Sequence, residues 1–140
     1  EFYRPFGIAI SPDGSVLFVA DISNHKIRRV EVATGAVSTL AGSGTAGSAD
    51  GVGDAAQFHK PAGVALSPDG GALFVADFGN HKVRRVEVAT GAVSAFAGSS
   101  TQGGSDGVGG AAEFAHPATV AISPDGSTLL VRTGNTTLRQ

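Results

Sequence analysis

Short apolar runs, each closed by a polar turn, follow one another along the chain. In residues 7–14 (GIAISPDG), Ile8 and Ile10 lie on one face of a predicted strand, and the run breaks at PDG. Proline presets φ, aspartate bonds to the backbone and glycine accepts a positive φ, so these three residues predict a tight turn. Residues 16–21 (VLFVAD) are a continuous apolar run, as expected for a strand that is covered on both faces.

The next stretch continues the same pattern. Residues 26–32 (KIRRVEV) and 36–42 (AVSTLAG) are predicted strands, separated by a turn at Thr34-Gly35. The stretch from Gly42 to Asp54 is rich in Gly, Ser and Ala and is predicted to be a long loop. No amphipathic helix pattern is present, and AAQF and AAEF are long enough for one helical turn at most. Four short antiparallel strands in succession favour an all-β fold of propeller blades over a solenoid or a βαβ unit.

One sequence unit recurs along the whole chain. Phe2, Phe58 and Phe114 lie 56 residues apart, and the SPDG turns keep the same spacing. Units 2–57 and 58–113 match at roughly two-thirds of their positions. The third unit, 114–140, starts in register, then loses one residue and ends before a fourth strand. A period of this length predicts radially repeated supersecondary units, here a partial propeller over residues 1–140.

The string PxG[IV]A[IL]SPDG, followed by LFVADxxNHK[IV]R, resembles the NHL repeat, and it is also similar to YVTN-type and WD40-like blades. The resemblance implies a propeller, most often of six blades, around a central channel. The matching turn residues occur twice: Asp21, Asn24 and His25, then Asp77, Asn80 and His81. In the third unit Arg132, Thr133 and Gly134 replace the Ala-Asp core of the motif.

About two and a half units cannot close a ring. Without closure, the first and last blades would expose apolar faces and unpaired strand edges. The outermost strand is the most dispensable one, because it packs on one neighbour. We therefore expect either two copies of the chain, each with three blades, around a two-fold axis, or continuation of the blades in a longer chain. The expected partner is the chain itself or the rest of a longer propeller.

The recurring turn residues could be ligands at a channel mouth, or they could hold the fold. Recurrence at the same blade position favours a structural role, because a catalytic residue is seldom needed in every blade. In that role Asp accepts backbone N–H groups and Asn tolerates a left-handed conformation. We predict no catalytic residues.

A ring of histidines could bind zinc. However, the third unit has Thr136 at the position of His25 and His81, and His59 and His116 are offset by one within their units. We predict no metal site and no cofactor.

Two further loop features resemble ion sites. Asp50 and Asp54 could offer two carboxylates to calcium, but the second unit has Asp106 with Gly110 in the place of Asp54, and an Asp-Gly turn explains the pattern. The Gly-Ser-Gly segment at 42–44 is followed by no helix and no lysine, which argues against a phosphate loop.

The basic residues of the third strand also recur, as Lys26, Arg28 and Arg29, then Lys82, Arg84 and Arg85. Some NHL propellers bind RNA through a basic face. Here 10 Lys and Arg stand against 12 Asp and Glu, a formal net charge of −2, and one Tyr is present for base stacking. Cross-strand ion pairs on a solvated face explain the pattern, and nucleic acid is not the expected partner.

The amino-acid composition narrows the possible functions only slightly. With no Cys there is no disulfide and no thiolate chemistry, and no apolar run approaches the length of a membrane span. Asn135 begins a candidate N-glycosylation sequon, which tilts an otherwise unknown location toward a secreted one. We expect a non-catalytic scaffold or protein-interaction module. The alternatives are part of a propeller enzyme of the lyase or lactonase kind with a channel metal, and an RNA-binding domain.

Overall fold

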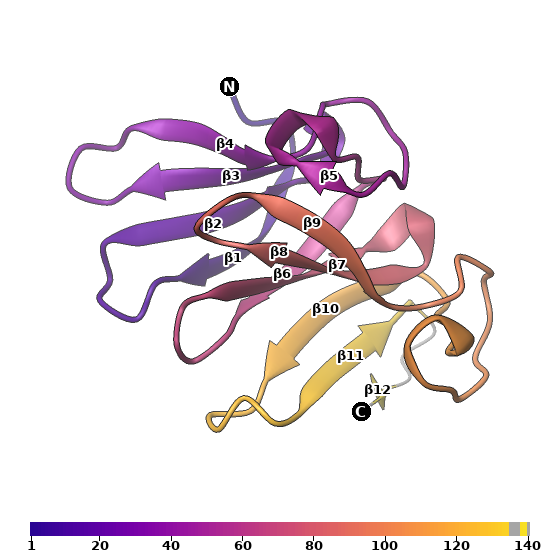
Figure 1. Ribbon diagram of the computed structural model, residues 1–140. Coiled ribbons are helices and arrows are strands. Elements are labelled where there is room, and N and C mark those ends of the chain that lie inside the picture. Colours follow the sequence, from indigo (N-terminus) through magenta and orange to yellow (C-terminus); the bar gives the residue numbers. More distant parts are fainter. Residues whose placement is uncertain (135–137, 140) are drawn as a thin grey trace.

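The computed structural model describes residues 1–134 and 138–139, which form three antiparallel sheets arranged like the blades of a fan (Figure 1). The first sheet contains β1 (Pro5–Ile10), β2 (Val16–Asp21), β3 (Lys26–Glu31) and β4 (Val37–Ala41) in chain order. The second contains β6 (Pro61–Leu66), β7 (Ala72–Asp77), β8 (Lys82–Glu87) and β9 (Ala92–Ala97), with β5 (Gly51–Val52) beside β9. The third contains β10 (Pro117–Ile122), β11 (Leu129–Thr133) and β12 (Leu138–Arg139). The predicted fold class, an incomplete ring of β-propeller blades, is confirmed.

The PDG turns form as the sequence predicts. Gly14 has a φ of 74°, and its N–H donates to the carbonyl of Ser11. Asp13 accepts from the N–H of Ser15 and from the hydroxyls of Ser11 and Ser15. These hydrogen bonds, led by the one from Ser11, lower the pKa of Asp13 to about 2. The same turn recurs around Gly70 and Gly126, so each blade has a preset connection between its first two strands.

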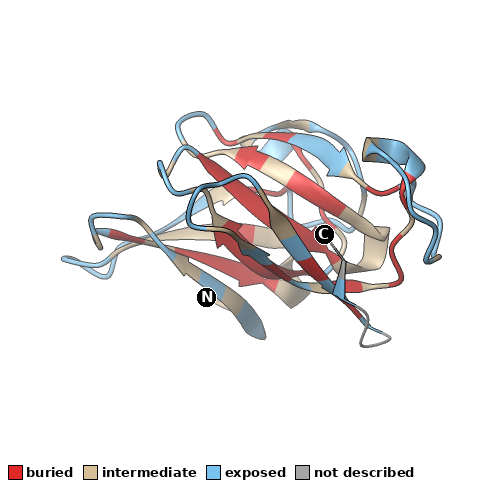
Figure 2. Cartoon of the chain, turned by 90° about the horizontal axis from the view of Figure 1, so that it is seen from below, coloured by how far each residue is buried: buried red, intermediate tan, exposed pale blue. Residues whose placement is uncertain are grey.

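The core lies between the blades rather than within them. One cluster joins the first blade to the second. It contains Phe18, Ala20 and Ile27 of the first blade, Phe58 at the start of the second unit, and Val75 of β7. A second cluster joins the opposite face of the second blade to the third. Figure 2 shows the buried positions concentrated in the middle of the fan, with exposed residues at its outer turns. Each sheet therefore needs a neighbour on both sides to cover its apolar residues.

The first strands of the blades approach one another very closely. A Cβ placed on Gly7 would lie 2.4 Å from the carbonyl oxygen of Ala62, and one on Gly63 would lie 2.7 Å from that of Ala118. Only glycine allows this backbone approach. The repeated glycine therefore sets the spacing of β1, β6 and β10 where the blades converge.

The long loop after β4 contains more structure than the sequence predicts. Two residues form β5, which pairs antiparallel with β9, and the 3-10 turn η2 (Gly53–Ala55) follows. The outer strand β9 thus has two neighbours, β8 and β5, which corrects the expectation that an outermost strand packs on one. Because β5 comes from the end of the first unit, this pairing joins consecutive units. The corresponding turn in the second unit is η4 (Gly109–Ala111).

Among the described residues, no helix is long and apolar enough to cross a membrane.

Candidate functional site

The two Asp-x-x-Asn turns are buried polar networks at the same end of neighbouring blades. Asp77 ends β7 and is fully buried; its Oδ1 accepts the N–H of His59 at 2.8 Å. Its Oδ2 accepts from Asn80 Nδ2 at 2.7 Å and from Arg84 Nη1 at 3.2 Å. Burial raises the pKa of Asp77, although each of these donors acts in the opposite direction.

The first blade contains the same arrangement. Asp21 accepts from the N–H of Tyr3 at 2.8 Å, from Asn24 at 2.8 Å and from Arg28 at 3.3 Å. The aspartate accepts a backbone N–H from 18 residues earlier in the chain, where the blade begins, and not from its own turn. It therefore ties the start of the first strand to the end of the second.

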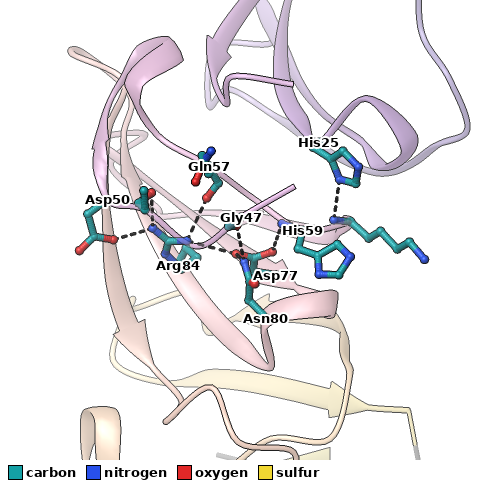
Figure 3. A network of polar contacts seen from close by, with 10 residues as sticks. His25, Gly47, Asp50, Gln57, His59, Asp77, Asn80 and Arg84 are labelled. Carbon is teal, nitrogen blue, oxygen red and sulfur yellow. Dashed lines mark hydrogen bonds and ion pairs between the residues drawn. The ribbon is translucent and has the colours of Figure 1, made fainter. Parts of the chain in front are cut away.

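Arg84 is the residue whose environment sequence reasoning missed. Its side chain is fully buried, and its guanidinium also bonds to Asp50 at 2.5 Å and to the carbonyls of Gln57 and Ala49 (Figure 3). The guanidinium carbon lies 5.6 Å from the ring centroid of Phe58. Arg84 thus connects the loop that leaves the first unit to the turn of the second. Asp50, one of the carboxylates considered for calcium, bonds to this guanidinium.

The expected cross-strand ion pairs on a solvated face form only in part. Arg28 and Arg84 do pair with Asp21 and Asp77 at the end of the neighbouring strand, but these pairs are largely buried rather than solvated. Arg29 pairs with Glu31 and Arg85 pairs with Glu87, each two residues along the same strand and on the same face. An Arg-Arg pair in a strand sends one side chain to each face, because strand residues alternate. Arg28 and Arg84 are the members that turn toward the buried aspartate. The alternation of side chains along the strand therefore indicates, from the sequence alone, that the two arginines of each pair have different environments.

The left-handed residue of each turn is the histidine, not the asparagine as expected. His25 and His81 have φ values of 55° and 56°, whereas the asparagines lie within the 3-10 turns η1 (Ile22–Asn24) and η3 (Phe78–Asn80). His25 Nδ1 accepts the N–H of Lys60 at 3.0 Å, and His81 Nδ1 accepts the N–H of His116 at 3.2 Å. Each of these inter-blade histidine contacts joins one blade to the start of the next.

The pKa of both turn histidines is lowered. Burial is the larger cause, followed for His25 by the charges of His59 and Lys60, and for His81 by those of His116 and His59. A neutral imidazole with a free Nδ1 lone pair is the form that accepts the backbone N–H. The lowered pKa therefore favours the state that holds the blades together.

The four histidines lie as two pairs. The rings of His25 and His59 are 5.9 Å apart, and those of His81 and His116 are 4.4 Å apart. In the part of the chain that the structure describes, no group of three or more metal-ligating side chains occurs. Thr136 and the candidate glycosylation residue Asn135 lie outside the described residues.

The repeat is similar to several known proteins. The family model described as NHL repeat matches residues 58–86, which include the second Asp-x-x-Asn-His turn and Arg84. The chain belongs to the NHL-repeat family. The sequence is 36% identical over 94 residues to NHL repeat-containing protein 2 of Bos taurus, covering 66% of this chain and 13% of that protein.

Two further similarities extend over almost the whole NHL chain. It is 31% identical over 147 residues to Protein SUPPRESSOR OF QUENCHING 1, chloroplastic, of Arabidopsis thaliana, covering 99% of this chain and 14% of that protein. Among solved structures, an auxiliary nutrient binding protein from Bacteroides thetaiotaomicron superposes with a TM-score of 0.76 at 25% identity, covering 90% of this chain and 34% of that one. The NHL chain thus spans a small part of each curated relative and about a third of a larger propeller-like structure.

Proposed function

We propose that this chain is a non-catalytic interaction scaffold whose open blade faces are completed by further blades. The supporting observation is a difference in exposure between equivalent residues of the first two blades. Ile8 is 62% exposed and Val37 is 43% exposed, whereas their counterparts Val64 and Val93, which pack on the preceding blade, are 8% and 4% exposed. The first blade carries the same apolar face as the second but lacks the neighbour that would cover it.

The polar residues of the motif support a non-catalytic role. The recurring Asp, Asn and Arg side chains bond to one another and to backbone groups, and the turn histidines accept N–H groups of the next blade. A catalytic group needs a free polar atom in contact with a substrate. The carboxylate oxygens of both aspartates and the Nδ1 atoms of both turn histidines already have partners within the fold.

Completion by further blades is tested by mass in solution. We expect multi-angle light scattering to give a mass above the 13.9 kDa of one chain, rising with concentration. Ile8→Lys on the exposed blade face should reduce association, because it places a charge in an apolar contact. The matched control is Val52→Lys, on a residue that is 57% exposed although its strand β5 already lies beside β9, which should leave the mass unchanged. A monodisperse, cooperatively folded monomer of the unmodified chain would contradict the proposal.

The enzyme alternative makes a different prediction. A propeller lyase or lactonase with a channel metal would retain a metal through purification and turn over an ester or a uronate substrate. Elemental analysis combined with a hydrolase and lyase screen therefore separates the two functions. Bound metal together with turnover would overturn the scaffold role.

A further inference from the structure

A cavity of about 270 Å³ opens where three consecutive blades meet, at the end that carries the 3-10 turns η1 and η3. Its lining comes from the starts of the first strands, with Arg4 and Phe6 in one unit, Lys60 and Ala62 in the next, and Ala118 in the third. The turns after the second strands add Ile22, Ser23 and Phe78. The cavity is thus lined by residues of a single chain, from all three blades.

The lining occupies positions at which the first two units differ. Arg4 corresponds to Lys60, Phe6 to Ala62, Ile22 to Phe78, and Ser23 to a glycine. The aspartate, asparagine, histidine and arginine of the turn networks are by contrast identical in the two units. Residues that hold a repeated fold are needed in every copy, so these lining positions, which vary between the units, are ones that the fold does not fix. The positive charge at Arg4 and Lys60 is nevertheless kept in both units.

The backbone at Arg4 and Lys60 is held by hydrogen bonds and has an unusual conformation. Arg4 and Lys60 both have a φ of 57° and precede a proline, a conformation that residues with side chains rarely adopt. The N–H of Lys60 donates to His25 of the first blade, and the neighbouring N–H of His59 donates to buried Asp77. The N–H of Tyr3, next to Arg4, likewise donates to Asp21, so both cationic side chains extend from backbone that is bonded to the fold.

The surroundings favour an anion. Among the residues that the structure describes, the cavity lining contains no carboxylate. The nearest motif carboxylates, Asp21 and Asp77, are fully buried and bonded to their own Asn and Arg partners. The aspartates of the PDG turns lie at the opposite end of the blades, between the first and second strands. Arg4 and Lys60 therefore face a site without a competing negative side chain.

The apolar part of the cavity contains two phenylalanines. Phe6 lines the cavity and is 61% exposed, on the blade that has no preceding neighbour. The ring of Phe78 packs beside that of His116, with 4.7 Å between the ring centroids. An exposed aromatic residue beside fixed cations is typical of a site that takes an amphipathic ligand.

We propose that this cavity binds a small organic carboxylate with an aromatic or branched aliphatic body. The guanidinium of Arg4 matches a carboxylate with two parallel N–H groups, and the ammonium of Lys60 adds a second positive charge. Phe6 and Phe78 contact the body of the ligand. The volume is slightly below that of drug-sized pockets and fits a group about the size of one amino acid. The carboxylate belongs either to a free acid or to the C-terminus of a peptide.

The probe is 3-phenylpropionate, titrated against the full chain by NMR and by calorimetry at low and moderate salt. We expect saturable binding that weakens with salt, and no comparable binding of the uncharged 3-phenylpropanamide. A short peptide with phenylalanine at a free C-terminus, compared with its amidated form, shows whether the carboxylate can be that of a chain end. Absence of saturable binding of both acids at millimolar concentration would overturn the proposal, as would equal binding of the amide.

The repeat supplies substitutions that the fold already accepts in another unit. Phe6→Ala copies the residue of the second unit and should weaken the probe several-fold. Arg4→Gln combined with Lys60→Gln should weaken it about tenfold or more, because two charge-assisted hydrogen bonds are lost. The control is Lys26→Gln, a cation outside the lining, which should leave affinity unchanged. Unchanged affinity in the Arg4 and Lys60 double variant, with its circular dichroism spectrum intact, would refute the assigned roles.

Discussion

Replacing Arg84 with methionine should destabilise the chain by about 3 kcal/mol, the lower end of the range for removing one partner of a buried ion pair. The substitution leaves the fully buried carboxylate of Asp77 without its counter-charge. Asp77 keeps its hydrogen bonds from His59 and Asn80, which limits the cost. Asp50 is 57% exposed in its side chain, so it regains water when the guanidinium is removed. Methionine retains an apolar contact with Phe58.

The measurement is urea unfolding followed by far-UV circular dichroism, at one protein concentration because association contributes to stability. The matched control is Arg85→Met on the neighbouring position, whose pair with Glu87 is about 40% exposed on both sides and should contribute about 0–1 kcal/mol. Adding Asp77→Asn to Arg84→Met should recover part of the loss, because no charge then remains buried. Since burial already raises the pKa of Asp77, the cost of Arg84→Met should also be smaller at pH 4 than at pH 7. Equal losses for Arg84→Met and Arg85→Met would refute this reasoning.

Three other predictions concern the turns. The pKa of His81 lies below its ordinary value of 6.5, so near and below pH 6.5 the unfolded chain binds more protons than the folded one. The free energy of unfolding should therefore fall as the pH drops below about 6.5. His81→Asn, in which asparagine tolerates the positive φ of this position, should reduce this pH dependence, measured by thermal unfolding at several pH values. Gly98→Ala should cost more than Gly14→Ala in urea unfolding, because a Cβ at Gly98 would lie 2.5 Å from a backbone oxygen whereas Gly14 has open space. Asp13 should titrate near 2 by NMR, and Ser11→Ala should raise its pKa toward the ordinary value of 3.8. Three results would contradict the corresponding predictions. They are a stability of the unmodified chain that does not change between pH 7 and 5, an equal destabilisation by Gly98→Ala and Gly14→Ala, and a pKa of Asp13 at its ordinary value.

The strands of the repeat could be predicted because their determinants are local. Alternating or continuous apolar residues between Pro-Asp-Gly and Asp-x-x-Asn turns define where each strand starts and stops, and β1 to β4 begin and end within a few residues of the predicted runs. The resemblance to NHL repeats followed from the same residues. The two residues of β5 escaped prediction because their pairing partner, β9, lies some 40 residues further along the chain.

The candidate site depended less on local sequence. Arg28 and Arg84 lie in identical KxRR segments, yet the guanidinium of Arg84 bonds to Asp50 from the preceding loop, and that contact forms only when the units pack together. The left-handed conformation fell on histidine rather than asparagine because the imidazole has a backbone donor in the next blade to bond. Neither contact is encoded within one turn.

The amino-acid sequence by itself determined the period, the strands and the identity of the turn residues, because these follow from spacing and backbone preferences within about 25 residues. The tertiary structure decided which charges are buried, which histidine joins which blade, and which variable positions meet around one cavity. Those outcomes require residues about 18 to 114 positions apart to converge at the blade ends. Inter-blade packing brings them together, so the contacts appear only once the blades are placed side by side.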